Sequence, residues 1–252
     1  MNYNWHWKVL LEMEPGGTGS YLQYLFVGLA WTLVTALAAW VIALSVGAVI
    51  GTLRTTPLKW VVRAGNLYVE IFRNVPLIVQ MFLWFFVVPE LLPKGLGDWI
   101  KQVPPPWGSY IPAVLCLGIF TSVRVAEQVR AGINSLPRGQ RFAGTAMGLT
   151  EAQTYRYVIL PQAFRIILPP LTSEFMNIIK NSSVALTIGL LELTGRARAM
   201  QEFSFRVFEA FTAATVIYLL TNLLVVLLMR VIEKKVRVPG LIAAGGAPQA
   251  GH

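Results

Sequence analysis

Apolar residues gather along the chain in five long runs that are separated by shorter polar segments. The first run is the longest, and residues 15–53 contain no charged side chain. A membrane-spanning helix needs about 20 consecutive apolar residues, so a continuous helix over Tyr21–Leu53 would project beyond the hydrocarbon layer. The other runs cover residues 74–89, 102–123, 166–189 and 210–229. This pattern predicts an all-α membrane protein with about five transmembrane helices.

Prolines mark where these runs depart from simple helices. Pro76 lies early in the second run, whose helix we expect to begin a little before the run, near Leu67. Three consecutive prolines, residues 104–106, open the third run, so its helix is expected to begin near Ser109. The fourth run opens with prolines at 169–170 and carries two charged side chains. It is therefore the weakest of the five predicted spans.

The composition agrees with a membrane protein. Charged residues make up 13% of the chain and hydrophobic residues 55%, whereas soluble domains carry about 25% charged residues. The net charge of +9 would suggest a nucleic-acid partner in a soluble protein. Here the basic residues lie mostly between and beyond the apolar runs, as cytoplasmic loops require, so no nucleic acid is expected. The single cysteine, Cys116, lies inside an apolar run and predicts a buried, inert thiol.

Basic residues near the ends of the runs predict the orientation in the membrane. Three segments that carry most of them are expected to be cytoplasmic: Arg54, Lys59, Arg63 and Arg73 after the first run; Arg130, Arg138, Arg141 and Arg156 after the third; and Arg230, Lys234, Lys235 and Arg237 after the fifth. The N-terminus is then outside and the C-terminus inside. The loop near residues 192–206, which carries three arginines, conflicts mildly with this orientation.

The two ends of the chain are expected to differ from its central part. Residues 1–19 contain Tyr3, Trp5 and Trp7, and aromatic residues of this kind anchor at a membrane interface. We therefore predict a periplasmic interfacial segment there, with a ligand-binding flap as the alternative. Residues 20–238 form the predicted transmembrane domain, and residues 239–252 a flexible tail.

Motifs for nucleotide binding, hydrolysis and metal binding are missing from the sequence. Neither a Gly-x-x-x-x-Gly-Lys-Ser/Thr phosphate loop nor His-Glu-x-x-His occurs, and both histidines, His6 and His252, lie near the termini. We expect no enzyme, no metal site and no cofactor bound by this chain. A transporter built on it would need an ion gradient or another subunit as its source of energy.

The loop at residues 136–161, LPRGQRFAGTAMGLTEAQTYRYVILP, is unusual for a membrane protein. It is predicted to be cytoplasmic and helical on both sides of a break at residues 148–150, with Thr150 as the N-cap of the second helix. Ala143, Gly144 and Ala146 give a surface that another protein can approach closely, and three arginines surround it.

This loop resembles the cytoplasmic signature of the permease subunits of ATP-binding-cassette (ABC) importers. That signature is Glu-Ala-Ala, three residues, Gly, nine residues, a hydrophobic residue, one more residue and Leu-Pro. Ala143, Gly148 and residues 159–161 match, whereas Phe142 and Gly144 stand where the family often has Glu and Ala. The resemblance implies a coupling helix that docks into a groove of the ATP-hydrolysing subunit. The implied coupling residues are Arg138, Gln140, Arg141, Ala143, Gly148, Leu149, Tyr155, Leu160 and Pro161.

A second block, YVEIFRNVPLIVQ at Tyr68–Gln80, is similar to the polar-amino-acid branch of these permeases, which includes the histidine and glutamine permeases. Blocks at residues 126–140 and 169–185 resemble the same branch, so the similarity runs from about residue 20 to residue 240. The motif residues are Glu70, Arg73, Pro76 and Gln80. Two alternatives stay open: Glu70 and Arg73 simply pair on one helix face, and Pro76 merely kinks a span.

Charged residues in or beside the apolar runs are the candidates for substrate binding, because a charge within a span is costly and usually functional. Arg124 and Glu127 follow the third run, and permeases of the bacterial glutamate/aspartate importer resemble this chain more closely, with an Arg at the first of these positions. We hypothesise that Arg124 binds a substrate carboxylate through its planar guanidinium. The alternative is a structural Arg124–Glu127 pair. Glu174 and Lys180 in the fourth run are secondary candidates.

Taken as a whole, the resemblance implies the MetI-like permease fold and an ATP-driven importer of L-glutamate or L-aspartate in the bacterial inner membrane. The implied partners are a dimer of ATPase subunits that use ATP, a second permease chain, like or unlike this one, and a periplasmic amino-acid-binding protein. A permease for other polar amino acids remains the alternative, followed by an ion-coupled secondary transporter, which would normally show more spans or an inverted repeat.

Overall fold

The computed structural model describes residues 3–236, and every regular element in this range is helical. The helices are α1 (Tyr21–Leu53), α2 (Lys59–Asn74), α3 (Leu77–Phe82), α4 (Val88–Leu91), α5 (Lys94–Lys101), α6 (Trp107–Asn134), α7 (Arg138–Ala146), α8 (Glu151–Thr154), α9 (Leu160–Asn181), α10 (Leu193–Ser204) and α11 (Val207–Val236). The predicted all-α class is confirmed. The predicted flexible tail, residues 239–252, lies outside the described residues.

Three helices are long and apolar enough to cross a membrane: α1, α6 and α11. A fourth span is possible by the same measure if α2 and the helical segment Leu77–Leu91 count together, although the two parts are bent by 100° at their junction. The weakest predicted span corresponds to α9, which carries charged side chains and does not meet this measure. Five spans therefore stay a prediction.

Several helix boundaries differ from those expected. The helix expected near Leu67 begins at Lys59 and ends at Asn74, because the residue before Pro76 is disfavoured in a helical conformation. The third long helix begins at Trp107 instead of near Ser109 and continues to Asn134. The helix of the fourth run begins far ahead of its two prolines, which lie inside α9. Packing against neighbouring helices makes such internal prolines tolerable in membrane proteins.

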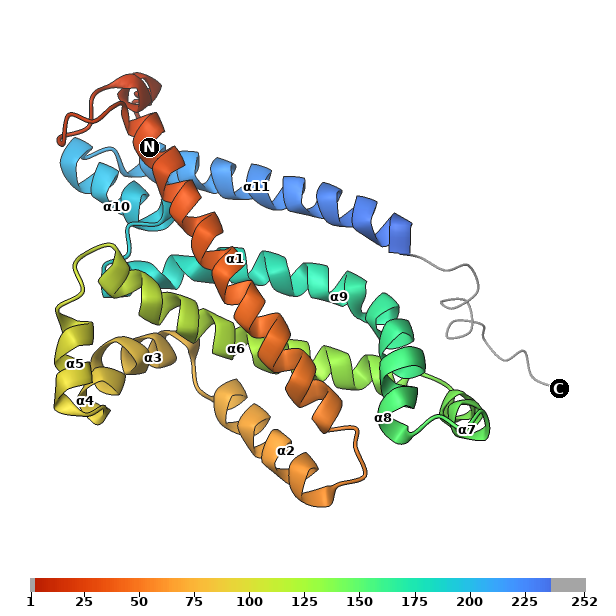
Figure 1. Cartoon of the computed structure of the whole chain (residues 1–252). Coiled ribbons are helices and arrows are strands. Elements are labelled where there is room, and N and C mark those ends of the chain that lie inside the picture. Colours follow the sequence, from red (N-terminus) through yellow and green to blue (C-terminus); the bar gives the residue numbers. More distant parts are fainter. Residues whose placement is uncertain (1–2, 237–252) are drawn as a thin grey trace.

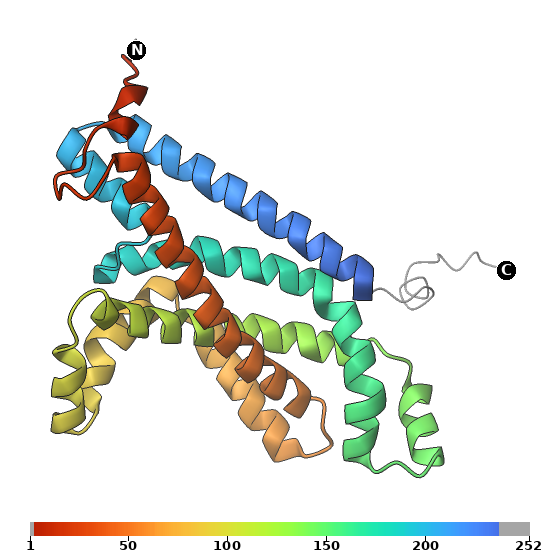
Figure 2. The same cartoon turned by 45° about the horizontal axis from the view of Figure 1, so that its top comes forward.

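The connecting segments gather at two opposite ends of the molecule. Figure 1 shows the N-terminus, α5 and α10 on the left, and α7, α8 and the last turns of α11 on the right; Figure 2 shows the same grouping. The segments predicted to lie outside are thus together, and those predicted to be cytoplasmic are together. The segment near residues 192–206, expected as a loop, is mostly the helix α10.

Helices α1 and α6 form the close central contact of the fold. A Cβ atom at Gly51 would lie 2.7 Å from the carbonyl oxygen of Ala126, and one at Gly118 would lie 2.8 Å from Cβ of Ile42. Apolar helices gain no hydrophobic attraction from each other in lipid, so small residues that permit backbone contact hold them together. This contact fixes the face of α6 that carries the charged candidates.

A buried carboxylate joins three helices near the left-hand end. Glu192, the N-cap of α10, accepts hydrogen bonds from the backbone N–H groups of Thr194 (3.0 Å) and Gly195 (2.8 Å). It also accepts from the hydroxyls of Thr32 on α1 (3.2 Å) and Tyr218 on α11 (2.7 Å). Four neutral donors replace water around the buried group, and α10 is fixed between α1 and α11.

The N-terminal segment folds back onto the start of α11. The Tyr3 hydroxyl and the backbone N–H of His6 both donate to the Glu209 carboxylate. Trp5 and Trp7 stack with ring centroids 5.1 Å apart and are exposed on their outer side. Their anchoring at a membrane interface stays a prediction.

Candidate functional site

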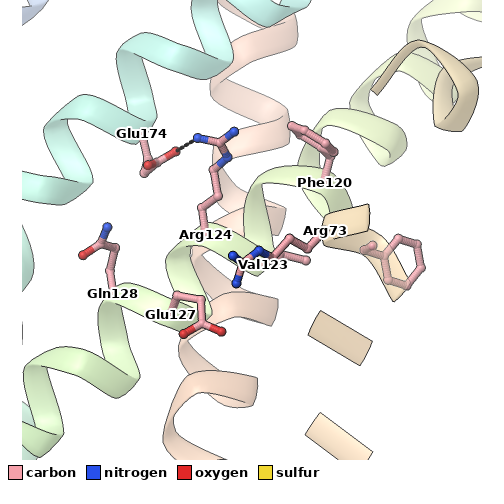
Figure 3. Close-up of a pocket in the computed structure, with 8 residues that line it drawn as sticks. Arg73, Phe120, Val123, Arg124, Glu127, Gln128 and Glu174 are labelled. Atoms are coloured by element: carbon pink, nitrogen blue, oxygen red, sulfur yellow. Dashed lines mark ion pairs between the residues drawn. The ribbon is translucent and has the colours of Figure 1, made fainter. Parts of the chain in front are cut away.

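A cavity of about 300 Å³ opens between α2, α6 and α9 (Figure 3). It brings together the three predicted substrate residues and one residue of the permease motif. Its lining is Phe72, Arg73, Phe120, Val123, Arg124, Glu127, Gln128 and Glu174. Five of these lie on one face of α6 at the three- and four-residue spacing of a helix. Phe120, Val123 and Gln128 were not among the predicted site residues, although their helical spacing from Arg124 and Glu127 on α6 is a signal that could have found them.

Arg124 reaches across the cavity toward α9. Its Nη1 atom lies 3.9 Å from Oε2 of Glu174, and its guanidinium lies 5.8 Å from the centroid of the Phe120 ring. The contact with Glu174 is too long for a hydrogen bond, and the Arg124 side chain is 53% exposed whereas that of Glu174 is 10% exposed. The guanidinium donors therefore face open space and remain available to a ligand.

Glu127 does not pair with Arg124. Its Oε1 atom lies 2.9 Å from Nη1 of Arg54, which follows the last residue of α1. The alternative interpretation, a structural Arg124–Glu127 pair, is therefore wrong. Arg124 pairs with Glu174, and Glu127 pairs with Arg54. The sequence pattern marked Arg54 only as a cytoplasmic charge, because its partner lies far away along the chain.

The four motif residues surround the break between α2 and α3. Pro76 is the N-cap of α3, and the buried Gln80 donates through Nε2 to the carbonyl oxygens of Phe72 (2.8 Å) and Val75 (3.0 Å). These bonds cap the end of α2 and set the direction in which its last turn points.

The last turn of α2 carries Arg73, which extends into the cavity toward α6 (Figure 3). Glu70 and Arg73 are both exposed and form no ion pair with each other in the described structure, so their pairing is not seen. Lys180 is exposed near the end of α9 and does not line the cavity.

The predicted coupling loop, residues 136–161, folds largely as expected. Helices α7 and α8 flank a turn in which Gly148 has φ +79°, a left-handed conformation that suits glycine. The Thr150 hydroxyl accepts from the Gln153 backbone N–H at 3.3 Å, and the Gln153 side chain accepts from the Thr150 N–H at 2.9 Å. This reciprocal capping box confirms the predicted N-cap. Leu160 and Pro161 form the first turn of α9.

The outer surface of α7 differs from the expected one. Phe142 is 71% exposed and Met147 is 82% exposed, and Ala143 and Ala146 are exposed as well. Gly144 is buried instead, and a Cβ there would lie 2.7 Å from Cγ2 of Thr154. Gly144 therefore packs α7 against α8 and does not contribute to the surface that a partner could reach.

Hydrogen bonds tie this loop to the turn between α1 and α2. The Tyr155 hydroxyl donates to the carbonyl oxygen of Thr55 at 2.9 Å. Arg141 donates to the same hydroxyl and lies 4.8 Å from the centroid of the Tyr155 ring. Gln140 accepts from Gln162 at 3.3 Å. The link through Thr55, one residue after Arg54, had no signal in the sequence.

Three more of the residues predicted to couple to an ATPase, Arg138, Arg141 and Leu149, have the following positions. The Leu149 backbone N–H donates to the Gly144 carbonyl oxygen at 3.1 Å and closes the turn after α7. Arg138 and Arg141 line a cavity of about 330 Å³ beneath the loop. In the part of the chain that the structure describes, no group of three His, Cys, Asp or Glu side chains could hold a metal ion.

The sequence is similar to known transport proteins along most of its length. Residues 43–238 match the family described as "Binding-protein-dependent transport system inner membrane component". The Glutamate/aspartate import permease protein GltJ of Escherichia coli (strain K12) is 48% identical over 95% of this chain and 98% of its own length. The Probable amino-acid ABC transporter permease protein PatM of Vibrio harveyi is 34% identical over 72% of this chain and 78% of its own.

Solved structures share the arrangement of helices. A crystal structure described as an amino acid ABC transporter with histidines matches with a TM-score of 0.72 and 31% identity, over 85% of this chain and 95% of that chain. An inward-facing structure of the MetNI methionine ABC transporter matches with a TM-score of 0.66 over 86% of this chain and 96% of that chain. At 19% identity, the second match concerns the fold alone.

Proposed function

Because this chain belongs to the family of binding-protein-dependent transport system inner membrane components, we propose that it forms the translocation path for L-glutamate and L-aspartate in an ATP-driven importer. The chain is a membrane-spanning permease of the amino-acid ABC importers, with the MetI-like fold, and its relatives are transport subunits and not enzymes.

The half-exposed guanidinium of Arg124, which is paired with Glu174 at 3.9 Å but makes no hydrogen bond to it, is the observation that carries the proposal. An acidic amino acid brings a second carboxylate into a medium of low dielectric constant, where an uncompensated charge is costly. Arg124 offers a planar pair of donors for such a carboxylate, and its present contact with Glu174 at 3.9 Å leaves those donors free. Arg73 adds a second positive charge to the same cavity.

The cavity also argues for a second permease chain. It lies at the surface of a single chain, and Arg124 is half exposed there, so a further wall is needed to enclose a path. A second copy or a related permease would supply it. A periplasmic binding protein would deliver the amino acid at the end that carries the N-terminus, α5 and α10. The expected location is the bacterial inner membrane, as for the relative from Escherichia coli.

Two ATPase subunits would drive transport through the coupling loop. The exposed apolar side chains of Phe142 on α7 and of Met147, which follows its last residue, suit a groove in a protein partner. ATP binding can shift the permease only if the ATPases bind one of its states more tightly than the other. Uptake that persists without any ATPase subunit would favour the ion-coupled secondary transporter instead.

The experiment that tests the proposal uses Arg124→Gln in the reconstituted complex of permease, ATPase and binding protein. Hydrogen bonds to charged groups contribute about 1.5–3 kcal/mol, so glutamate-stimulated ATP hydrolysis and glutamate uptake should fall about tenfold or more. Arg130→Gln, on the same helix but outside the cavity lining, should retain both activities. Unchanged selectivity between glutamate and glutamine in the Arg124 variant would show that the guanidinium does not bind the side-chain carboxylate.

A further inference from the structure

The cavity contains two acidic side chains, Glu174 facing Arg124 at 3.9 Å and Glu127 near Arg124 on α6, at a place where an acidic substrate is proposed to bind. A free carboxylate there would repel the substrate and compete with it for Arg124. We propose that Arg54 is a positioning residue that holds Glu127 away from Arg124 and thereby keeps the cavity suited to acidic amino acids. This inference rests on the proposed function, and it adds a determinant of substrate preference that lies outside the cavity lining.

The position of Glu127 on α6 would allow it to compete with the substrate for Arg124. Glu127 lies three residues after Arg124, and side chains at this spacing are neighbours on one helix face. The two could form an ion pair without any change in the backbone. Instead Glu127 Oε1 lies 2.9 Å from Arg54 Nη1, and Figure 3 shows its carboxylate directed away from the Arg124 guanidinium.

Arg54 is buried and is positioned by its neighbours. Its side chain is 4% exposed, and its Nε atom donates to Oδ1 of Asn66 at 2.8 Å. Its Cγ atom lies against Gly65, where a Cβ would come within 2.6 Å. The backbone N–H of Arg54 continues the hydrogen bonding of α1 by donating to Ile50 at 3.0 Å. The guanidinium is thus fixed between α1, α2 and α6 before any substrate arrives.

Burial decides which arginine Glu127 joins. A buried guanidinium that lacks a carboxylate is strongly destabilising, whereas an exposed one remains hydrated and loses little. Arg54 is buried and Arg124 is half exposed, so the Arg54–Glu127 pair is the more stable arrangement. The consequence is that Glu127 is neutralised by its own partner and Arg124 keeps its donors for a ligand.

The test is the binding of radiolabelled glutamate and glutamine to the purified complex of permease and ATPase without binding protein, so that only the permease site is measured. Arg54→Gln should release Glu127 and raise the Kd of glutamate about tenfold, because an unscreened like charge then faces the substrate. The Kd of glutamine, which has no side-chain charge, should stay within about twofold.

Two further variants separate positioning from simple structural support. Arg54→Lys keeps a positive charge within reach of Glu127 and should retain most of the preference for glutamate. Arg54→Gln combined with Glu127→Gln removes both charges and should restore the glutamate Kd toward that of the unchanged protein. A combined variant that stays as weak as Arg54→Gln alone would overturn the proposal, as would an Arg54→Gln effect that is equal for both amino acids.

A milder variant tests the proposal if the Arg54→Gln permease does not assemble with the ATPase. Asn66→Ala removes only the hydrogen bond to Arg54 Nε and leaves both charges in place, so it should weaken glutamate binding to a smaller extent and spare glutamine. An Asn66→Ala complex with unchanged glutamate binding would overturn the proposal.

Arg124→Gln in the same assay distinguishes a failure of the proposed substrate site from a failure of the positioning role of Arg54. If it leaves the ratio of the two dissociation constants unchanged, the proposed substrate site fails whatever Arg54 does. If it changes the ratio and Arg54→Gln does not, only the positioning role fails.

Discussion

Gly47 and Gly51 lie four residues apart on α1 and determine how closely α1 approaches α6. A Cβ at Gly47 would lie 2.7 Å from the carbonyl oxygen of Ser122, and one at Gly51 would lie 2.7 Å from that of Ala126. Backbone atoms cannot move aside as the end of a flexible side chain can. The Gly-x-x-x-Gly spacing of close helix pairs in membranes is thus present in the sequence of α1.

Gly51→Ala should therefore destabilise the protein. Overpacking a close contact costs about 1–3 kcal/mol, which should lower the midpoint of thermal unfolding of the detergent-solubilised complex. Gly95→Ala is the matched control, because nothing lies within 4 Å of a Cβ at that position of α5, and it should leave the midpoint unchanged or raise it. Equal midpoints of thermal unfolding for the two variants would show that the α1–α6 contact accommodates an added methyl group without loss of stability.

The charged residues of the cavity could be found from the sequence only in part. Arg124, Glu127 and Glu174 stood out because ionisable groups in apolar surroundings are rare and costly. Their pairing could not be predicted, since Arg54 approaches Glu127 from a different helix and helical spacing favours the neighbour on the same helix. Residue types thus pointed to the site, while the three-dimensional fold decided which charges neutralise each other.

In the predicted coupling loop, the helices and their cap could be predicted from the sequence, but the contact with the rest of the fold could not. Its two helices and the Thr150 cap follow from local chemistry, namely the glycine turn and the reciprocal hydrogen bonds with Gln153. Its attachment to the α1–α2 turn depends on Tyr155, which contacts a residue distant in the chain, and no local pattern encodes that contact. A π-helical turn, Tyr155–Ile159, brings the tyrosine into this position, and such turns are frequent at functional sites.

Tyr155→Phe should weaken the transmission between ATPase and permease. The change keeps the ring against Arg141 and removes the hydroxyl, which donates to Thr55 and accepts from Arg141. A hydrogen bond contributes about 1 kcal/mol, so ATP hydrolysis stimulated by the loaded binding protein should fall about fivefold while the ATPase still copurifies. Tyr157→Phe is the control, because the Tyr157 side chain is exposed. Equal stimulation in both variants would contradict a role for the Thr55 contact.

The molecule as a whole has two ends of different character, which Figure 1 shows at left and right. One end gathers the N-terminal segment, α5 and α10, and the other the coupling helices and the last turns of α11. Between them, α11 carries large exposed side chains, Leu219, Leu220, Leu223, Leu224, Leu227 and Leu228. Such a face suits lipid or another membrane-spanning chain. The distribution of basic residues predicted this two-ended grouping of segments, whereas the packing of α9 against α6 and α11 required the folded structure.

Cysteine labelling tests the orientation of the two ends. The chain has one cysteine, Cys116, which is buried, so Cys116→Ala gives a background without thiols. In spheroplasts, a membrane-impermeant maleimide should label Asp98→Cys on α5 and should not label Gly139→Cys on α7. Detergent should make both positions reactive. Labelling of the α7 position alone in intact spheroplasts would reverse the predicted orientation.

Two neighbouring residues in the turn after α1 make separate contacts. The side chain of Arg54 reaches Glu127 at the cavity wall, and the carbonyl oxygen of Thr55 accepts the hydrogen bond from the coupling loop. Residues joined by one peptide bond cannot move independently, so the proposed effect of Arg54 on substrate preference and the proposed coupling to the ATPase depend on the same piece of backbone. Engineering this permease toward a neutral substrate should therefore begin at Arg124, because a change in the turn would alter both the substrate preference and the coupling to ATP hydrolysis.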